Sequence, residues 1–365
     1  MKLMTIFGTR PEIIRLSLII KQLDRFCKHV VVHTGQNYDE NLSDVFFREL
    51  GLRQPDLYLG VQAADFAEQV GQIITRASKV MDDVKPDRVM ILGDTNSGLS
   101  AVVAARLGIP VFHLEAGNRC YDDRVPEEIN RRIIDHCSTV LMPYTNRSRD
   151  NLLREGIESD RIFVIGNPIY EVLNTYGAQI ETGKVLPRLG LEPQQYFLVT
   201  MHREENVDEP SRLKTLLEGL ERVGEKYQQP IVVSLHPRTR DKMRQYGLEV
   251  RCQQIRLLNP LGFFDFVALE RNARCVLTDS GTVQEECCIF GVPNVTIRDV
   301  TERPETVECG SNILSGAHPE MIMQAVDIAL NSSYEWIPPS EYVAPHVSAR
   351  VGKIVLGYRC QPLRA

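Results

Sequence analysis

Residues 113–136 read HLEAGNRCYDDRVPEEINRRIIDH, and the rest of the chain is organised around this stretch. An apolar run ends at Glu115, as a buried strand of a parallel sheet does. Pro126 then opens a predicted helix, because proline lacks the N–H that the first helical residue leaves unpaired. Glu127 lies in the first turn of that helix. Since the carboxyl ends of parallel strands face the ligand crevice of an open α/β sheet, we expect Glu115 and Glu127 to approach one cleft.

The predicted helix after Pro126 also carries an apolar stripe at helical spacing, which we expect to be buried: Ile129, Ile133 and Ile134. Acidic residues in a first turn often serve the helix dipole alone, so Glu127 taken singly is more often structural than catalytic. The loop arginines Arg119 and Arg124 fit either an anion site or a solvated, ion-paired surface. Similar polar clusters recur after several other predicted strands, and this recurrence favours the functional interpretation.

Composition limits the class of protein. A chain of 365 residues suits two domains. With 43% hydrophobic and 25% charged residues it is a globular sequence, and its net charge of −6 argues against a nucleic-acid partner. No apolar run approaches the roughly 18 residues that span a bilayer, so no membrane partner is expected. The nine cysteines show no metal-ligand spacing, which predicts no metal site. Their odd number, together with the lack of a secretion signal in the first residues, favours free thiols in a reducing cytoplasm.

Apolar runs alternate with helical patterns along most of the chain, which predicts an α/β fold of parallel sheets covered by helices. The predicted strands are residues 3–7, 30–34, 88–92, 111–114, 139–142, 162–165, 196–200, 231–235, 255–257, 275–278, 294–297 and 311–314. The predicted helices include residues 65–80, 97–107 and 319–330. The pattern weakens between residues 176 and 195, where we place the domain boundary. We therefore expect an N-terminal Rossmann-like domain, 1–176, joined by a C-terminal helix, 347–365, and a second Rossmann-like domain, 196–346, with an interdomain cleft.

In the first half, two further polar clusters follow predicted strands. Gly8-Thr9-Arg10-Pro11 combines a glycine turn, a helix start and an arginine, which suits an anion. Arg15, one turn further on, is expected to point the same way, although an ordinary turn with solvated arginines fits equally. Asp94 follows the predicted strand 88–92, where it is as consistent with a turn or cap as with catalysis. Arg131 belongs to the cluster around Glu115.

In the second half, histidines follow two predicted strands and polar residues start a helix after a third. His202-Arg203 and His236 suggest groups that face a phosphate. Ser280, Gly281 and Thr282 offer backbone and hydroxyl donors for a diphosphate, and Glu286 can accept hydrogen bonds from a ribose diol. Read alone, Ser280 is a helix cap. Arg303 adds a cation nearby. The chain has no GxGxxG or P-loop lysine, so a dinucleotide cofactor or an NTPase gets little support.

Seven motifs carry a family resemblance: GTRPE (8–12), GDTNS (93–97), HLEAG (113–117), RVPEEINR (124–131), MHREEN (201–206), DSGTVQEE (279–286) and TERPE (301–305). In this order they resemble the non-hydrolysing UDP-N-acetylglucosamine 2-epimerase family. The resemblance implies a GT-B-like fold of two Rossmann-like domains and a homodimer. It implies inversion of C2 of a UDP-HexNAc without a nicotinamide cofactor. The implied route is anti elimination of UDP to a 2-acetamidoglucal, followed by re-addition of UDP.

The resemblance also assigns roles position by position. Its catalytic residues fall on Asp94, Glu115, Glu127 and His202. Either Asp94 or Glu115 is the base for the C2 proton, with Glu127 assisting and His202 contacting the diphosphate. The substrate-binding residues fall on Arg10, Arg15, Arg131, Arg203, His236, Ser280, Gly281, Thr282, Glu286 and Arg303. UDP leaves readily only if arginines, histidine and helix N-termini neutralise its developing charge.

The sequence departs from the family pattern at three places. Arg15 stands where the family usually has lysine, which keeps the charge but changes the geometry. Gly281-Thr282 replaces the usual pair of glycines. The segment HTGQNYDENL (33–42) keeps Gln36 but lacks other residues that hold a second, activating UDP-GlcNAc, so allosteric activation is not expected.

Alternative functions remain at this stage. The residues of several motifs are most similar to a branch of the family that epimerises modified sugars for capsule and O-antigen synthesis. An example is the conversion of UDP-2-acetamido-2,6-dideoxy-L-talose to UDP-N-acetyl-L-fucosamine. A hydrolysing 2-epimerase would differ only in the second half-reaction. A GT-B glycosyltransferase would use the same UDP site without needing carboxylates around C2. A non-catalytic sugar-nucleotide sensor would not need so many ionisable residues at strand ends.

Overall fold

The computed structural model describes residues 1–35, 40–63, 65–332 and 335–359. Contacts divide the chain into two compact units. Unit 1 comprises Met1–Thr175 and Ser340–Ala365, and unit 2 comprises Tyr176–Pro339. Each unit contains a six-stranded parallel sheet, so the chain has the α/β class predicted from the alternating pattern.

The sheet of unit 1 has the strand order β3-β2-β1-β4-β5-β6. Its strands are β1 (Lys2–Phe7), β2 (Lys28–His33), β3 (Leu57–Tyr58), β4 (Arg88–Leu92), β5 (Val111–Leu114) and β6 (Val140–Met142). Residues of β1, β4 and β5 are almost all buried, because helices cover both faces of a parallel sheet. This is the Rossmann order, in which the chain reverses direction across the sheet between β1 and β4.

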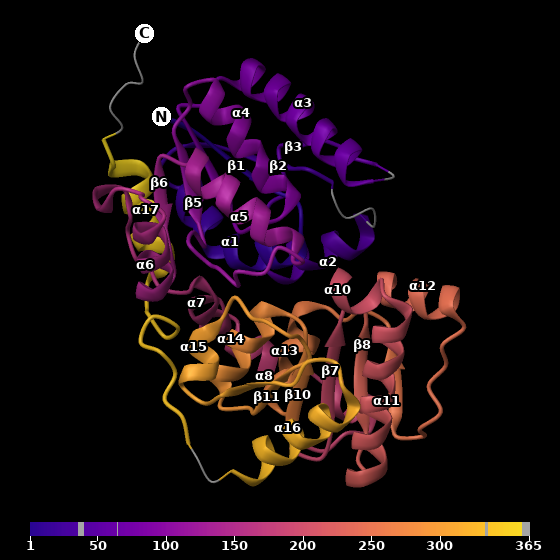
Figure 1. Ribbon diagram of the computed structural model, residues 1–365. Helices are drawn as coiled ribbons and strands as arrows, with labels where there is room; N and C mark the ends of the chain where they lie inside the picture. The colour runs from indigo at the N-terminus through magenta and orange to yellow at the C-terminus, as the bar shows by residue number, and fades with distance from the viewer. Residues whose placement is uncertain (36–39, 64, 333–334, 360–365) are drawn as a thin grey trace. The chain divides into compact units, whose positions relative to one another are not determined.

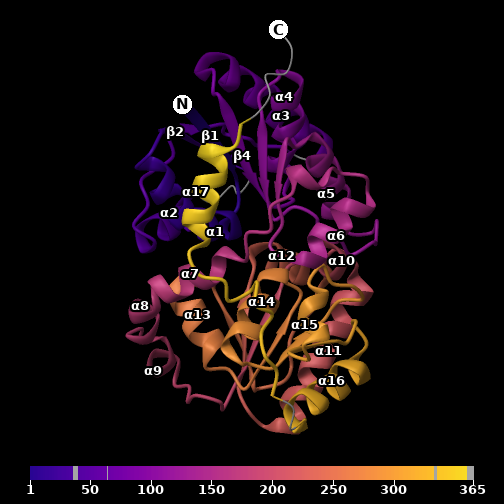
Figure 2. The same cartoon turned by 90° about the vertical axis from the view of Figure 1, so that its left-hand side faces the viewer.

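Helices of unit 1 form two groups (Figure 1). One group packs α3 (Phe66–Val84) against α4 (Ser100–Arg106), and α4 against α5 (Pro126–Cys137). The other includes α1 (Arg10–Asp24), α7 (Pro168–Thr175) and α17 (Val347–Gly357), and Figure 2 shows α17 alongside α1. The remaining helices are α2 (Glu40–Glu49) and α6 (Asn146–Arg154). Two hydrogen bonds hold α17 to α7, from Ser348 N and Oγ to the carboxylate of Glu171, at 2.8 and 2.7 Å.

Unit 2 repeats the same sheet order as β12-β11-β10-β7-β8-β9. Its strands are β7 (Phe197–Met201), β8 (Ile231–Leu235), β9 (Ile255–Leu258), β10 (Cys275–Thr278), β11 (Asn294–Thr296) and β12 (Asn312–Leu314). Its helices are α8 (Gly177–Glu181), α9 (Val185–Leu189), α10 (Glu204–Val207), α11 (Pro210–Tyr227), α12 (Pro237–Tyr246), α13 (Phe263–Arg271), α14 (Gly281–Phe290), α15 (Pro304–Glu308) and α16 (Pro319–Asn331) (Figure 1). Two Rossmann-like units are what a GT-B-like fold requires.

Several details differ from the sequence-based predictions. One is the short strand β3, which was not among the predicted strands. Residues 162–165 do not form a strand; Ile162 makes only an isolated bridge to Leu141. The segment between residues 176 and 195 contains the two short helices α8 and α9. The predicted stripe on α5 is wrong, because Ile129 and Ile133 are 49% and 39% exposed while Ile134 is buried. The buried face of α5 instead carries polar residues, since it packs against the strand ends that bear the candidate site.

Two further observations concern the described residues. Within ranges 1–35, 40–63, 65–332 and 335–359, no helix is long and apolar enough to cross a membrane. The cysteines in these ranges are free thiols.

Candidate active site

The predicted site residues gather at the carboxyl ends of strands, around the switch point of each sheet. In unit 1, the turn at Gly8 follows β1 and Asp94 follows β4, the two strands that flank the reversal. In unit 2, His202 follows β7 and Ser280 follows β10, the equivalent pair. Ligands of open α/β sheets bind outside the carboxyl ends of the strands at these points. The strand order therefore places each cluster where a ligand is expected.

In unit 1, the carboxylate of Glu12 links the turn after β1, which contains Gly8 and Thr9, to the turn after β4, which contains Thr95. One carboxylate oxygen accepts hydrogen bonds from the N–H groups of Gly8 and Thr9 at 2.9 and 2.7 Å. The other accepts a bond from the hydroxyl of Thr95 at 2.9 Å. Burial raises the pKa of Glu12 to about 7, although these donors oppose the shift. Sequence reasoning assigned no role to Glu12; its place three residues after Thr9, where a capping box puts glutamate, was the available signal.

Asp94 is held by an arginine from α5. Nε and one terminal nitrogen of Arg131 lie 2.8 and 2.7 Å from Asp94 Oδ2. The other terminal nitrogen of Arg131 donates to the buried Glu128 at 2.8 Å, and Glu128 also accepts bonds from the N–H groups of Cys120 and Tyr121. Arg131 therefore has two carboxylate partners, and its bond to Asp94 fixes that side chain at the end of β4.

Glu115 is held by a different arginine. Arg15 is 2% exposed, and its Nη1 donates to Glu115 Oε2 at 3.1 Å. Asn118 donates to the other carboxylate oxygen at 3.2 Å. The backbone of Glu115 has φ 67, a left-handed conformation that non-glycine residues adopt mainly where the surroundings require it. A Cβ added to Gly93 would lie 3.5 Å from Glu115 Oε2, so this carboxylate is packed beside the Asp94 turn.

The remaining predicted residues of unit 1 lie at helix starts. Glu127 is half-buried in the first turn of α5, next to the fully buried Glu128. Arg10 is the first residue of α1, with its guanidinium carbon 6.0 Å from the centre of the Phe46 ring. Arg15 was expected to point toward an anion; in the structure its Nη1 contacts the carboxylate of Glu115, and its guanidinium carbon lies 5.6 Å from the centre of the Tyr144 ring.

In unit 2, Asp279 organises the turns after β7 and β10. Its Oδ2 accepts bonds from the N–H groups of His202 and Arg203 at 2.8 and 2.9 Å, and from the amide of Asn206 at 3.2 Å. His202 Nδ1 lies 3.1 Å from Asp279 Oδ1. Burial acts to raise the pKa of Asp279, but the charge and hydrogen bonds of His202 and the two N–H groups hold it well below its usual value. Sequence reasoning gave Asp279 no role, although it directly follows a predicted strand.

A cluster of ion pairs lies beside this turn. Glu302 accepts from Arg203 at 3.2 Å and from the buried Arg298 at 2.8 Å. Arg303 pairs with Glu285 at 2.5 Å. A Cβ added to Gly281 would collide with a carboxylate oxygen of Glu302. Gly281 thus lets the start of α14 approach Glu302, although its neighbour is Thr282 and not a second glycine.

The donors predicted for a diphosphate lie on neighbouring elements of unit 2. Ser280 precedes the first residue of α14, and its hydroxyl lies 3.0 Å from the hydroxyl of Thr282. His236 precedes α12, and its Nδ1 accepts the N–H of Arg238 at 3.2 Å. The rings of His202 and His236 are 5.7 Å apart. Two histidines, two hydroxyls and the start of a ten-residue helix make this part of unit 2 suited to an anion.

Glu286, the candidate ribose ligand, has a second buried carboxyl beside it. Glu270 on α13 is fully buried and hydrogen-bonds Glu286 and the thiol of Cys287. Burial, and then the charge of Glu286, raise the pKa of Glu270 well above its usual value. Two adjacent buried carboxyls cannot both be ionised at low cost. Burial and the neighbouring Glu286 therefore favour the protonated form of Glu270.

This proton makes stability depend on pH. Between its unfolded pKa of 4.5 and its higher folded pKa, Glu270 is protonated only in the folded protein. Stability therefore falls as pH rises through that window. We expect Glu270→Gln, which stays neutral, to reduce the fall in unfolding free energy between about pH 5 and about pH 8. Urea titrations at both pH values measure this, with Glu225→Gln at an exposed position as control. An unchanged pH dependence in Glu270→Gln would contradict the raised pKa of Glu270.

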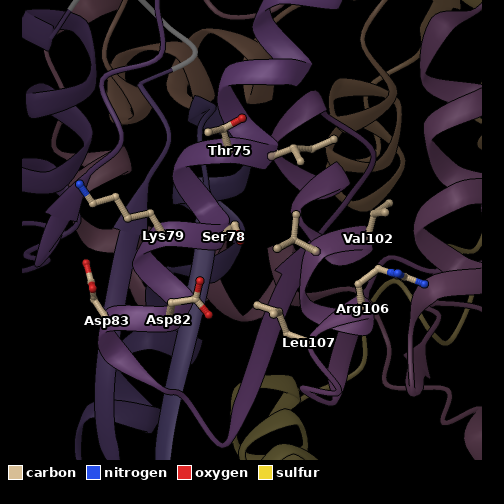
Figure 3. A pocket seen from close by; sticks show the side chains of 10 residues that line it. Thr75, Ser78, Lys79, Asp82, Asp83, Val102, Arg106 and Leu107 are labelled. Atoms are coloured by element: carbon tan, nitrogen blue, oxygen red, sulfur yellow. The ribbon is translucent and has the colours of Figure 1, made fainter.

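Other features of the described residues do not join these clusters. A pocket of about 690 Å³ is lined by residues of α3 and α4 and by Leu107, and none of the predicted site residues lines it (Figure 3). In the part of the chain that the structure describes, no three His, Cys, Asp or Glu side chains gather as metal ligands would. Gln36 lies outside the described residues.

Comparison with known proteins identifies the family. Residues 21–356 match the family model described as UDP-N-acetylglucosamine 2-epimerase. The chain belongs to the UDP-N-acetylglucosamine 2-epimerase family. It is 43% identical to the UDP-N-acetylglucosamine 2-epimerase of Methanocaldococcus jannaschii, over 93% of this chain and 95% of that protein. It is 37% identical to the UDP-2,3-diacetamido-2,3-dideoxy-D-glucuronate 2-epimerase of Pseudomonas aeruginosa, over 92% of this chain and 94% of the relative.

A solved structure of the epimerase family agrees with the fold. The crystal structure of the M. jannaschii UDP-GlcNAc 2-epimerase in complex with UDP-GlcNAc and UDP matches with a TM-score of 0.93 and 42% identity. The match covers 97% of this chain and 99% of that chain. The resemblance drawn from seven motifs and the GT-B-like fold are thus confirmed, and the protein is an isomerase of the epimerase family.

Proposed function

We propose that this protein inverts C2 of a UDP-N-acetylhexosamine, interconverting UDP-GlcNAc and UDP-ManNAc. One observation carries the proposal: Asp94 and Glu115, at the carboxyl ends of adjacent strands, are each held by a different arginine. A C2 proton is weakly acidic, so its removal needs a fixed carboxylate, and its return on the opposite face needs a second group. Two separately anchored carboxylates in unit 1 supply such a pair.

In the proposed reaction one carboxylate takes the C2 proton as the bond from C1 to the UDP oxygen breaks. The products of this anti elimination are UDP and 2-acetamidoglucal. UDP then adds back to C1, and a proton is delivered to the opposite face of C2. Asp94 and Glu115 are the candidates for the base, and Glu127 assists.

We assign nucleotide binding to unit 2. The start of α14, the hydroxyls of Ser280 and Thr282, and Arg203 offer donors to a diphosphate. His202 and His236 add two imidazoles, and His202 is oriented by the carboxylate of Asp279. Donors fixed before the reaction stabilise the charge that develops on the departing UDP. Glu286 accepts hydrogen bonds from the ribose, and Arg10 and Arg303 complete the substrate-binding set.

A modified sugar is the alternative substrate. The relative in P. aeruginosa is named as a 2-epimerase of a UDP-linked diacetamido sugar acid. In addition, the residues of several motifs are most similar to the capsule and O-antigen branch. We therefore keep UDP-2-acetamido-2,6-dideoxy-L-talose as a second candidate, and with it a role in the synthesis of surface polysaccharide precursors. A homodimer is part of the same proposal, and light scattering of the purified protein tests it.

Product analysis of the purified protein tests the substrate. UDP-GlcNAc is incubated without added nicotinamide cofactor, and the nucleotide sugars are separated by chromatography. We expect UDP-ManNAc to accumulate to a constant ratio, with no free ManNAc. Free ManNAc with stoichiometric UDP would indicate a hydrolysing enzyme. Conversion of the 6-deoxy substrate alone would indicate the modified-sugar branch, and a requirement for a sugar acceptor would indicate a glycosyltransferase.

A further inference from the structure

Unit 1 contains a buried ionic cluster behind the candidate carboxylates. It joins His113 on β5, Asp135 on α5 and Arg119 in the loop between them, whose side chains are 0–1% exposed. His113 Nδ1 lies 2.8 Å from Asp135 Oδ1, and its Nε2 lies 2.8 Å from the carbonyl oxygen of Gly93. Arg119 lies 2.8 Å from Asp135 Oδ2 and also binds Glu155.

The hydrogen-bond partners fix the protons in this cluster. A carbonyl oxygen only accepts hydrogen bonds, so His113 Nε2 donates to Gly93. Burial acts to raise the pKa of Asp135, but hydrogen bonds and charges from His113 and Arg119 hold it below its usual value. His113 therefore links the carboxyl group of Asp135 on α5 to the backbone at the end of β4.

The cluster contacts the three segments that carry Asp94, Glu115 and Glu127. Through His113, the cluster holds Gly93, the residue before Asp94. Through Asp135 Oδ2 it holds the N–H of Gly117 at 3.1 Å, two residues after Glu115. Asp135 itself belongs to α5, the helix whose first turn contains Glu127. One carboxylate thus ties two strand-end loops to the helix that supplies the third acidic group.

We propose that His113 and Asp135 are positioning residues for the C2 epimerisation, which set the relative placement of the segments bearing Asp94, Glu115 and Glu127. The inference rests on the proposed function for its effect on rate, but its effect on the loops is independent of the substrate. General acid–base catalysis depends on geometry within about an ångström, and a displacement of that size can cost about 10²-fold in rate. His113 and Asp135 act through backbone groups and touch no reacting atom in this account.

Asp135→Asn is the test variant, because an amide keeps the shape but has one oxygen for three donors. We expect kcat to fall about 10- to 100-fold, while the affinity for UDP, measured by calorimetry, changes less than about twofold because unit 2 is unaltered. We expect Asp135→Asn and His113→Gln to be non-additive, so that the double variant is no slower than the slower single variant. A merely structural role would lower stability without this split between kcat and UDP binding.

Unit 1 contains a second His–Asp pair, at the amino ends of its strands, which serves as a matched control. His29, near the start of β2, pairs with Asp24 at 2.7 Å, and its other ring nitrogen contacts Thr5. Asp24→Asn makes the same chemical change in a His–Asp pair at the amino ends of the strands. We expect this variant to keep the kcat of the wild type, measured well below its melting temperature. Equal kcat in Asp135→Asn and the wild type would overturn the proposal.

Hydrogen exchange separates this inference from the proposed function. We expect peptides covering residues 92–96 and 115–120 to exchange faster in Asp135→Asn than in the wild type, and to be unchanged in Asp24→Asn. If the wild type acts on no UDP-HexNAc, the proposed function fails, and this comparison still decides whether the pair orders the loops. Unchanged exchange of both peptides in Asp135→Asn would overturn the positioning role.

Discussion

Replacing Glu115 by glutamine is expected to lower kcat for C2 epimerisation by about 10²- to 10⁴-fold, the usual contribution of a general acid or base. The amide fills the same space but cannot take a proton from C2 or return one. Arg15 contacts the Glu115 carboxylate at 3.1 Å, and the amide oxygen of glutamine can still accept this hydrogen bond. We expect Asp94→Asn to have an effect of similar size, and steady-state rates with UDP-GlcNAc measure both.

Two comparisons make this prediction specific. Glu158→Gln, at an exposed carboxyl of unit 1, should keep the wild-type rate. The affinity for UDP should be unchanged in Glu115→Gln, because the nucleotide is assigned to unit 2. Wild-type turnover in both Glu115→Gln and Asp94→Asn would remove these residues from the chemistry.

Replacing Asp279 by asparagine is expected to destabilise the protein by about 3–5 kcal/mol, as removal of one partner from a buried charged cluster does. The carboxylate of Asp279 accepts from two backbone N–H groups and the amide of Asn206, and it faces the ring of His202. An asparagine side chain would turn an NH₂ group toward some of these donors. Because the same bonds set the His202 turn, we also expect UDP affinity to fall. Urea unfolding and calorimetry measure the two effects.

The pH dependence gives an independent check. The pKa of Asp279 is held below that of the unfolded chain, so its contribution is complete above the unfolded pKa. It is lost as pH falls through the lower, folded value. Asp279→Asn should therefore lose less stability on acidification than the wild type. Asp265→Asn, in a partly exposed pair with Arg188, should cost less than about 1 kcal/mol. An equally small cost in Asp279→Asn would contradict the proposed role of Asp279.

Most strands could be predicted because parallel strands are buried on both faces and appear as continuous apolar runs. The same rule failed at residues 162–165, an apolar run that makes only one bridge. The prediction of a buried apolar stripe on α5 failed for a different reason. That helix buries Asn130, Arg131 and Asp135, because its inner face borders the candidate site, so its apolar residues do not mark its buried side.

The candidate site was predictable only in part. Residues such as Asp94 and His202 were found because they directly follow apolar runs, and strand ends meet at one edge of a sheet. Their partners were not found, because a pairing such as Arg15 with Glu115 joins residues far apart in the sequence. Periodicity gives no information on such contacts. Asp135 was missed for the same reason, because its partners are far away in the sequence. Asp279 directly follows a predicted strand, but its bonds to the N–H groups of His202 and Arg203 also join residues far apart in the sequence.

The central claim is that this chain removes and returns the proton on C2 of a UDP-N-acetylhexosamine. Proton NMR of the purified protein with UDP-GlcNAc in D₂O tests it most directly. We predict loss of the C2 proton signal as deuterium enters, in both UDP-GlcNAc and newly formed UDP-ManNAc, and no exchange in Glu115→Gln. Retention of the C2 proton in UDP-GlcNAc and in the 6-deoxy UDP-HexNAc alike would contradict the account.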